Sequence, residues 1–425
     1  MEQNKFAILA IFLTVYVFLC AAKRFRATAA CLGVAAMVLV GWGTFTLSEV
    51  FWSVKWNVIG IFAGTLILAE LFTESRVPAR LADILVMKAR SVGNAALLIC
   101  ILSGVISIAV ANVATVLIIA PIAVELARRL KVSPVPFLIG IAISSNLQGT
   151  ATLIGDPPSM ILADHERMGF LDFFWYRGRP GIFFAVEIGA ALSFLVLYLF
   201  YRKYRQPVVA PKLEEVKTWT PTVLLSVMIV ALSIVSSYNF SLSGATCMVL
   251  AGVGLLFAFR ENRREALGVI KRYDFSTTFL MAGIFVLVQG LEEAGILEDI
   301  SLFMRNIVGT NRFVAFTLVV WFSVLFSAFI DNIPYIIIML PVVYRLSIEM
   351  GMQNDYLLAF GLVLGSCLGG NITHIGASAN VVAVGIARRQ GYPINLFEFA
   401  EIGLPFTIAA TLGGYIFVWL TWAGS

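Results

Sequence analysis

Long apolar runs are the feature that most constrains how this chain can fold. They lie at about residues 6–22, 27–46, 56–72, 93–130, 135–163, 180–201, 219–236, 241–259, 275–291, 313–348, 355–387 and 402–422. A helix needs about 20 apolar residues to cross a bilayer. Charged residues make up 13% of the 425 residues, about half their share in a soluble domain. The runs therefore exclude a soluble domain and predict an all-α polytopic membrane protein with about 10–12 transmembrane helices.

Four of the apolar runs are too long for a single straight helix and carry polar breaks. We expect re-entrant hairpins over residues 93–131 and 313–350, and broken helices over residues 135–165 and 355–388. Each hairpin returns to its starting side. With the N-terminus outside, 22 of the 30 Lys and Arg residues fall on the inner side. The positive-inside rule then predicts a multi-pass protein of the inner (cytoplasmic) membrane with both termini outside.

An internal repeat relates the two halves at an offset of about 220 residues. The matching pairs are Asn112 with Asn332, Pro121 with Pro341, Gly149 with Gly370, Thr152 with Thr373, Gly155 with Gly376, and Ala63-Gly64 with Ala282-Gly283. The orientation above sends the run at 56–72 inward and the run at 275–291 outward. We therefore expect two inverted-topology repeats, the signature of secondary transporters. Residues 1–203 form the first half, 204–218 a cytoplasmic linker, and 219–425 the second half.

Each half carries two polar interruptions, at 111–115 and 144–158 in the first and at 331–334 and 369–380 in the second. Broken backbone at membrane depth persists only where it is buried in protein or lines a wet cavity. The matched breaks therefore indicate one central site, where half-helix N-termini, carbonyls and Asn, Ser or Thr oxygens can bind ions. The expected ion- or substrate-binding residues are Asn112, Thr115, Asn146, Gly149, Thr150, Thr152, Asp156, Asp331, Asn332, Asn371, Thr373, His374, Ser378 and Asn380.

Two carboxylates within the breaks carry the charge of this expected site. A carboxylate in an apolar surround is a functional candidate by default, although Asp331 could instead cap the helix that follows it. Asp156 precedes Pro157 and could likewise be a structural N-cap. Either Asp could exchange a proton for a cation, and Na⁺ is the candidate metal at Asn112, Asp156, Asp331 and Asn332. His374 could sense pH or be a hydrogen-bonded structural residue.

The break motifs resemble those of a known family. Residues 149–158 (GTATLIGDPP), 331–334 (DNIP) and 370–380 (GNITHIGASAN) are similar to the ion transporter superfamily. The resemblance is to its branch of arsenite permeases, sodium/proton antiporters and the melanosomal P protein, with their citrate transporter-like domain. It implies an inverted-repeat fold with a scaffold part, a mobile transport part and a homodimer. Dicarboxylate relatives bind sodium at Ser-Asn-Thr hairpin tips. The tips here read Ala-Asn-Val (111–113) and Asp-Asn-Ile (331–333), so that sodium site is carried over only in part.

The charges of the breaks favour one substrate class. No Lys or Arg lies within them, so a dianion would depend on helix dipoles and amides beside two Asp residues. A monovalent cation or a neutral hydroxide such as arsenous acid fits better. We therefore predict a secondary active transporter of a small inorganic ion or hydroxide, and no enzyme. The expected mode is proton-coupled antiport, either arsenite/antimonite efflux or Na⁺/H⁺ exchange.

Three alternatives remain open on the sequence alone. A sodium-coupled importer of anions or dicarboxylates such as citrate is the main one, and a channel or an intramembrane aspartyl protease is remote. No cofactor and no nucleic-acid partner is expected. The chain has no Gly-x-x-x-x-Gly-Lys-Ser/Thr motif, so a separate ATPase subunit would be needed if ATP drove export.

Overall fold

The fold is almost entirely helical. A computed structural model describes residues 2–21, 25–40, 46–129, 132–208, 213–352 and 356–424. Apart from two single-turn 3₁₀ segments, the one non-helical element in these ranges is a short antiparallel pair of strands, β1 (Trp175–Tyr176) and β2 (Arg179–Pro180). Lys23, Arg24, Lys131 and Lys212, which the charge count places on the inner side, lie outside the described residues, as do residues 209–212 of the predicted linker.

Within the described ranges, ten α-helices come from each half of the chain. The first ten are α1 (Glu2–Ala21), α2 (Arg26–Val40), α3 (Leu47–Ser53), α4 (Trp56–Glu74), α5 (Val77–Lys88), α6 (Val92–Ser107), α7 (Asn112–Arg129), α8 (Val135–Gly149), α9 (Pro157–Glu166) and α10 (Ile182–Tyr201). The second ten are α11 (Thr220–Tyr238), α12 (Ser243–Glu261), α13 (Arg263–Arg272), α14 (Phe275–Glu293), α15 (Ile296–Val308), α16 (Arg312–Ser327), α17 (Asn332–Glu349), α18 (Leu357–Gly369), α19 (Ser378–Arg389) and α20 (Leu396–Trp422).

Each of the four long apolar runs contains two helices separated by a short connection. Helices α6 and α7 lie in the first predicted hairpin, with its tip at residues 108–111, and α16 and α17 lie in the second, with its tip at 328–331. Residues 150–156 separate α8 from α9, and residues 370–377 separate α18 from α19; these are the first and second breaks.

The packing repeats between the halves. Helix α6 packs on α8 and α7 on α8, as α16 packs on α18 and α17 on α18; α4 packs on α12 as α14 packs on α2. Glycines permit both of the last two contacts at matching places. A Cβ on Gly64 would lie 2.4 Å from the Cys247 carbonyl carbon, and a Cβ on Gly283 would lie 2.8 Å from the Ala30 Cβ. The offset of about 220 residues thus recurs as a shared packing scheme.

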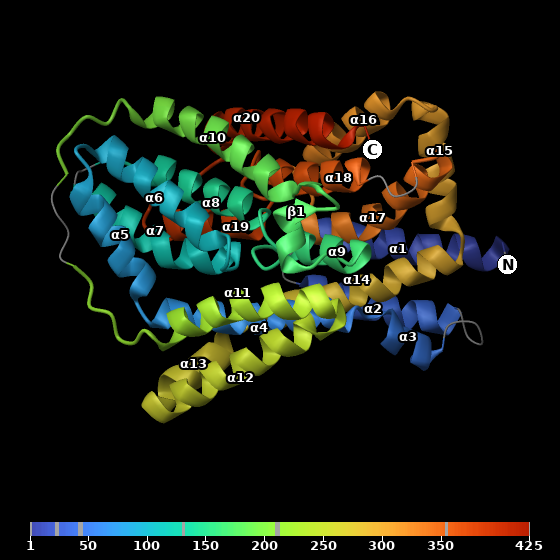
Figure 1. Cartoon of the computed structure of the whole chain (residues 1–425), viewed down its shortest axis with the longest axis horizontal. Coiled ribbons are helices and arrows are strands. Elements are labelled where there is room, and N and C mark those ends of the chain that lie inside the picture. The colour runs from blue at the N-terminus through green and yellow to red at the C-terminus, as the bar shows by residue number, and fades with distance from the viewer. Residues whose placement is uncertain are drawn as a thin grey trace.

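Matched helices of the two halves run in opposite directions. Figure 1 shows α4 leading from α3 at one end of the molecule to α5 at the other, whereas α14 leads from the end near α13 to α15 at the opposite end. The first hairpin likewise lies toward the α5 end and the second toward the α15 end. This arrangement is consistent with the inverted relation that the sequence predicts.

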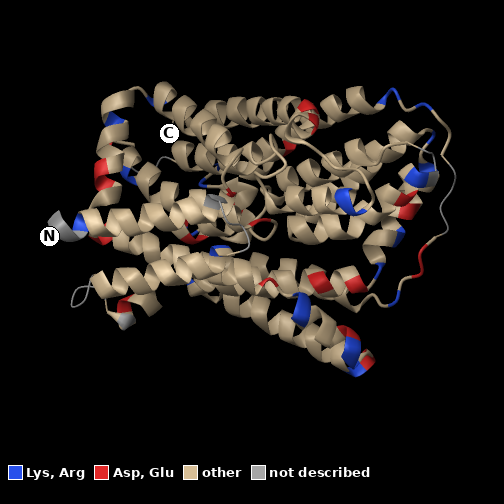
Figure 2. Ribbon diagram, turned by 180° about the vertical axis from the view of Figure 1, so that it is seen from behind, with Lys and Arg blue, Asp and Glu red and all other residues tan. Residues whose placement is uncertain are grey.

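The helices have the length and polarity of membrane spans. Seven helical segments among the described residues are long and apolar enough to cross a membrane, and α15 with α16, bent by 120°, would make an eighth. The shorter apolar helices include α6, α8 and α18, which belong to the hairpins and broken helices. Many of the Lys, Arg, Asp and Glu residues lie toward the two ends of the molecule (Figure 2). The predicted all-α polytopic fold is confirmed.

Candidate functional site

The two hairpin tips and the first break meet around one buried carboxylate, that of Asp156. Asn332, the first residue of α17, donates from Nδ2 to Asp156 Oδ2 at 3.1 Å. Asn112, the first residue of α7, also forms a side-chain hydrogen bond with Asp156. All three side chains are buried. The two asparagines matched by the internal repeat therefore converge on a single acid.

The local sequence explains why the Asp156 carboxylate faces the hairpin tips. Pro157 and Pro158 begin α9 at the positions where a missing backbone N–H costs least. Asp156 occupies the N-cap position with extended backbone, but its side chain accepts no hydrogen bond from the helix. The carboxylate is instead directed at the hairpin tips, so capping does not account for it.

Asp331 has a different set of partners. Its Oδ1 accepts from the backbone N–H of Ile333 at 3.3 Å, which is the capping role expected as the structural alternative. Its Oδ2 accepts from Arg26 at 2.8 Å, and the Ser378 hydroxyl lies 3.4 Å from the same oxygen. Asp331 thus caps α17 and also carries an ion pair.

The ion pair with Arg26 was not foreseen from the sequence. The charge count places Arg26 on the inner side beside Lys23 and Arg24; in the structure its side chain is only 13% exposed and contacts the second hairpin tip, so it is not a solvent-exposed loop charge. The position of Arg26 at the start of a long apolar run is the sequence feature that could have indicated its burial. Although no basic residue lies within the breaks, one reaches the site from α2.

Three asparagines join the two broken helices behind the hairpin tips. Asn146 of α8 donates from Nδ2 to Asn371 Oδ1 at 2.8 Å and to Asn380 Oδ1 at 2.9 Å. Asn380 donates in turn to the carbonyls of Gly370 and Thr373, both at 2.8 Å. These three residues, all predicted for the site, form a buried polar link between the breaks. Buried polar side chains are stabilised by hydrogen bonds of this kind.

Matched threonines clamp each break onto its own hairpin. Thr152 donates to the carbonyl of Ile108 at 2.5 Å, and Thr373 donates to the carbonyl of Ala328. The two contacts are the same contact in the two halves. Both threonine hydroxyls are therefore occupied by backbone, which favours a structural role over direct binding.

Glycines allow the breaks to approach the tips closely. A Cβ on Gly149 would lie 2.2 Å from Asn112 Oδ1. A Cβ on Gly155 would lie 2.8 Å from the Ser107 carbonyl oxygen, and one on Gly376 would lie 2.9 Å from that of Ala328. Side chains at these positions would push the tips away from the centre.

The central cluster is formed by Asp156, Asp331, Asn112, Asn332 and Arg26. The remaining predicted residues lie around it. Thr115 and Thr150 are buried and donate to backbone carbonyls, those of Val110 at 3.4 Å and Asn146 at 3.3 Å. His374 is half-buried within the second break, and Ser378, exposed, begins α19.

The charges of the cluster suit a cation or a proton. Asp156 and Asp331 lie close enough to repel one another, and Arg26 supplies one positive charge, so the cluster carries a net charge of −1 when all three are ionised. Oxygen donors of this kind suit hard cations such as Na⁺. Among the described residues, no three His, Cys, Asp or Glu side chains are grouped to hold a metal ion.

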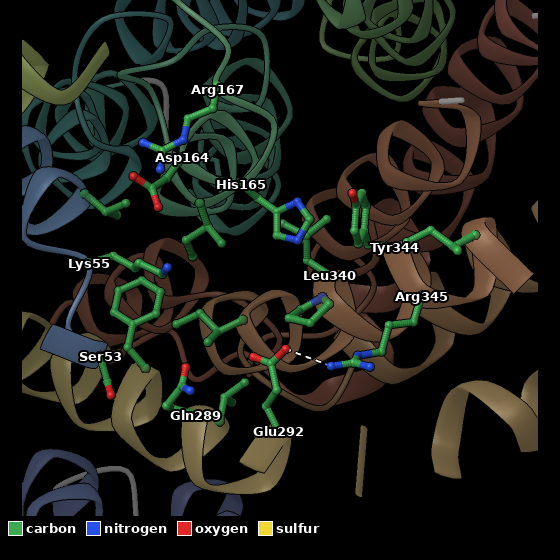
Figure 3. A pocket seen from close by; sticks show the side chains of 17 residues that line it. Ser53, Lys55, Asp164, His165, Arg167, Gln289, Glu292, Leu340, Tyr344 and Arg345 are labelled. Atoms are coloured by element: carbon green, nitrogen blue, oxygen red, sulfur yellow. Dashed lines mark hydrogen bonds and ion pairs between the residues drawn. The ribbon is translucent and has the colours of Figure 1, made fainter. Parts of the chain in front are cut away.

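A cavity of about 400 Å³ is lined by residues of the helices that begin at the site. Its walls come from α9 and α17 on one side and from α14 and the start of α4 on the other. Figure 3 shows His165 beside Tyr344, and the ion pair of Glu292 with Arg345 at 2.9 Å. Ile161 and Ile337 line the cavity five residues after Asp156 and Asn332, which is about 7.5 Å along a helix. We call this cavity the vestibule.

Comparisons with known proteins find similar transporters. The profile of a family described as citrate transporter (CitMHS) matches residues 16–365. An uncharacterized transporter of Mycobacterium tuberculosis is 29% identical over 420 residues, which cover 96% of this chain and 97% of that protein. The P protein of Homo sapiens is 26% identical over 484 residues, covering 92% of this chain and 57% of that protein. The YdaH transporter of Alcanivorax borkumensis is similar in fold, with a TM-score of 0.60, 13% identity and coverage of 88% and 87%.

Proposed function

Because this chain belongs to the CitMHS citrate transporter family, we propose that it is a secondary active transporter that exchanges a small inorganic ion or hydroxide for protons. Na⁺ or Li⁺ and arsenite or antimonite are the proposed substrates. One observation carries the proposal. Asp156 is buried between amides from the tips of both halves, and no ion pair joins it to a Lys or Arg among the described residues.

A carboxylate in this environment can drive exchange. A buried charge without a partner is costly, so Asp156 is most stable when it holds either a proton or a cation. Since the same oxygens receive both, binding of one displaces the other. If the mobile part faces one side at a time, each cycle carries a cation one way and a proton the other, which is antiport. A proton that crosses 100 mV provides about 2.3 kcal/mol.

The vestibule supports access from one side. It is lined by residues of α9 and α17, whose N-terminal ends lie at Asp156 and Asn332, and by residues of α4 and α14, which pack on α12 and α2. We infer that α6–α9 and α16–α19 form the mobile part and that the other long helices form the scaffold. The homodimer and the outer position of both termini stay predictions.

A sodium-coupled importer of citrate-like anions is the second candidate. Arg26 favours it, because this residue brings a guanidinium to the second hairpin tip. In the structure, however, that guanidinium is already paired with Asp331, and the net charge of the cluster is negative.

The test uses purified protein in proteoliposomes that contain a pH-sensitive dye. Outside Na⁺, Li⁺, arsenite and citrate are added in turn. We expect Na⁺, Li⁺ or arsenite to change the internal pH, and Asp156→Asn to abolish that change while the protein stays folded. Glu215→Gln, at an exposed carboxylate of the linker, is the matched control. A response to citrate that requires sodium, with no proton movement, would contradict the proposal in favour of the second candidate.

A further inference from the structure

Arg26 is held in place from two directions. Its Nε donates to the carbonyl of Leu19 at 3.0 Å, and its Nη1 donates to Asp331 Oδ2 at 2.8 Å. Leu19 lies in the last turn of α1, where backbone carbonyls have no partner within the helix. The guanidinium therefore has a fixed position against the tip of the second hairpin, and both side chains of the ion pair are nearly buried, at 13% and 7% exposed.

The pair adds an ionic contact between two parts of the molecule that also pack on one another where α14 meets α17 and α4 meets α9. Arg26 begins α2, which packs on α1 and α14, whereas Asp331 lies between α16 and α17, which pack on α18. The bond is thus a contact between the inferred scaffold and the inferred mobile part, at the site itself.

The pair also exists in only one half. At the spacing of the α2 and α12 contacts, where Ala30 corresponds to Cys247, Arg26 corresponds to Ser243. Asp331 corresponds to Ala111, and Asp156 to Ala377. Both halves share the packing. None of the three charges of the cluster has a charged counterpart in the other half. Packing of the repeat alone does not require them.

On the basis of the function proposed above, we propose that Arg26 is a positioning residue that serves as a built-in counter-cation at Asp331. It occupies the place of a monovalent cation when the site is empty, and an arriving Na⁺ or Li⁺ displaces it. The displaced guanidinium keeps its bond to the Leu19 carbonyl. Binding of the cation thereby releases the second hairpin tip from α2, and departure of the cation lets the pair form again.

This role predicts opposite effects on binding and on turnover. Without Arg26, no internal group competes for Asp331, so the cation binds more tightly. Release then becomes slower, because no guanidinium returns to replace the cation. A residue that only held the fold would not tighten binding.

The test measures the Na⁺ and Li⁺ concentrations that half-maximally raise the melting temperature of the purified full-length protein, and KM and kcat in proteoliposomes. We expect Arg26→Gln to lower the half-maximal concentration and KM roughly tenfold, which corresponds to about 1.4 kcal/mol, and to lower kcat. Arg26→Lys keeps the charge and should restore values near those of the unchanged protein. Arg76→Gln, which removes an exposed ion pair with Glu214, is the control.

A second comparison applies even if Arg26→Gln does not fold. Asp331→Asn and the double variant Arg26→Gln/Asp331→Asn both lack the carboxylate for which Arg26 and the cation compete, so we expect the loss of Arg26 to tighten Na⁺ binding much less than tenfold between these two. A tenfold difference between these two would overturn the inference, as would Arg26→Gln matching Arg76→Gln, or a raised KM for citrate in Arg26→Gln. If the unchanged protein responds to neither cation in either assay, Na⁺/H⁺ and Li⁺/H⁺ exchange fail as well, and transport of citrate would favour the second candidate function, whereas the tenfold difference and the match to Arg76→Gln overturn the inference alone.

Discussion

At the scale of single residues, the two acids of the site differ in their partners. Asp331 is paired with Arg26 and caps α17, whereas Asp156 accepts hydrogen bonds only from neutral amides. The sequence leaves both acids open to structural roles, and the contacts favour Asp156 as the more available carboxylate. The proposed transport cycle nevertheless requires both acids, because the second hairpin tip is released only when Asp331 exchanges Arg26 for a cation.

Replacement of Asp331 tests that requirement. Asp331→Asn keeps the size of the side chain but removes the charge that binds Arg26 or a cation, so we expect coupled transport to be lost while the protein remains folded in the membrane. Pulsed pH changes on proteoliposomes measure the coupling. Normal pH-dependent flux in this variant would defeat the assignment of Asp331.

Gly149 tests how closely the first break must approach the hairpin tip. A methyl group there would overlap Asn112 Oδ1, so Gly149→Ala should move Asn112 away from Asp156. Overpacking of this kind costs about 1–3 kcal/mol, and we expect transport to fall at least tenfold.

The control for that variant is Gly385→Ala, within α19, where a Cβ would meet nothing within 4 Å. It should be neutral or slightly stabilising, because alanine is the better helix former. Equal transport by the two variants would show that the Gly149–Asn112 approach does not matter.

At the scale of elements, each hairpin tip is attached to its own broken helix by one threonine. The hydroxyl of Thr152 and that of Thr373 bind carbonyls of the first and second tips. These carbonyls would otherwise be left without a partner in a buried region, which costs more than the hydrogen bond itself provides. The tip and the break of each half should therefore move as one body.

Valine at either position keeps the shape of threonine and removes the donor. We expect Thr152→Val and Thr373→Val each to lower the free energy of unfolding by about 1–3 kcal/mol, visible as a lower melting temperature, and to slow transport. Thr246→Val removes an exposed hydroxyl that binds the carbonyl four residues earlier in α12 and should change neither. A melting temperature unchanged by both buried substitutions would contradict the proposal that these threonine hydroxyls attach the hairpin tips to the breaks.

The sequence predicts these elements well and their contacts only in part. The spacing of Asn112 to Pro121, repeated as Asn332 to Pro341, places both hairpin tips, because such breaks at membrane depth leave few other structures. The same reasoning could not find the link from Asn146 to Asn371 and Asn380 or the pair of Arg26 with Asp331. Those contacts join segments more than 200 residues apart, and no local pattern specifies which face of a helix meets another.

At the scale of the whole molecule, the vestibule defines an open side. Its lining includes Lys55, Arg167 and Arg345, which the charge count assigns to the outside together with the N-terminus. With that predicted orientation, we expect the vestibule to open to the outside.

Labelling of the vestibule tests this reading. Tyr344 is 48% exposed and lines the cavity, so Tyr344→Cys should react with a membrane-impermeant thiol reagent added outside intact cells. Cys31, the exposed cysteine among those described, is replaced by Ala in the background. Reaction only after the cells are opened would place the vestibule on the inner side.

The most direct test of the account concerns the opposed orientation of the two halves, on which the shared central site depends. Lys88 ends α5 and Asn306 lies on α15, the corresponding helix of the second half, and both are exposed. In the background without Cys31, Lys88→Cys and Asn306→Cys are each treated with an impermeant thiol reagent, with intact and with opened cells. The account predicts that Asn306→Cys reacts in intact cells and Lys88→Cys only in opened cells, and reaction of both from the same side would contradict it.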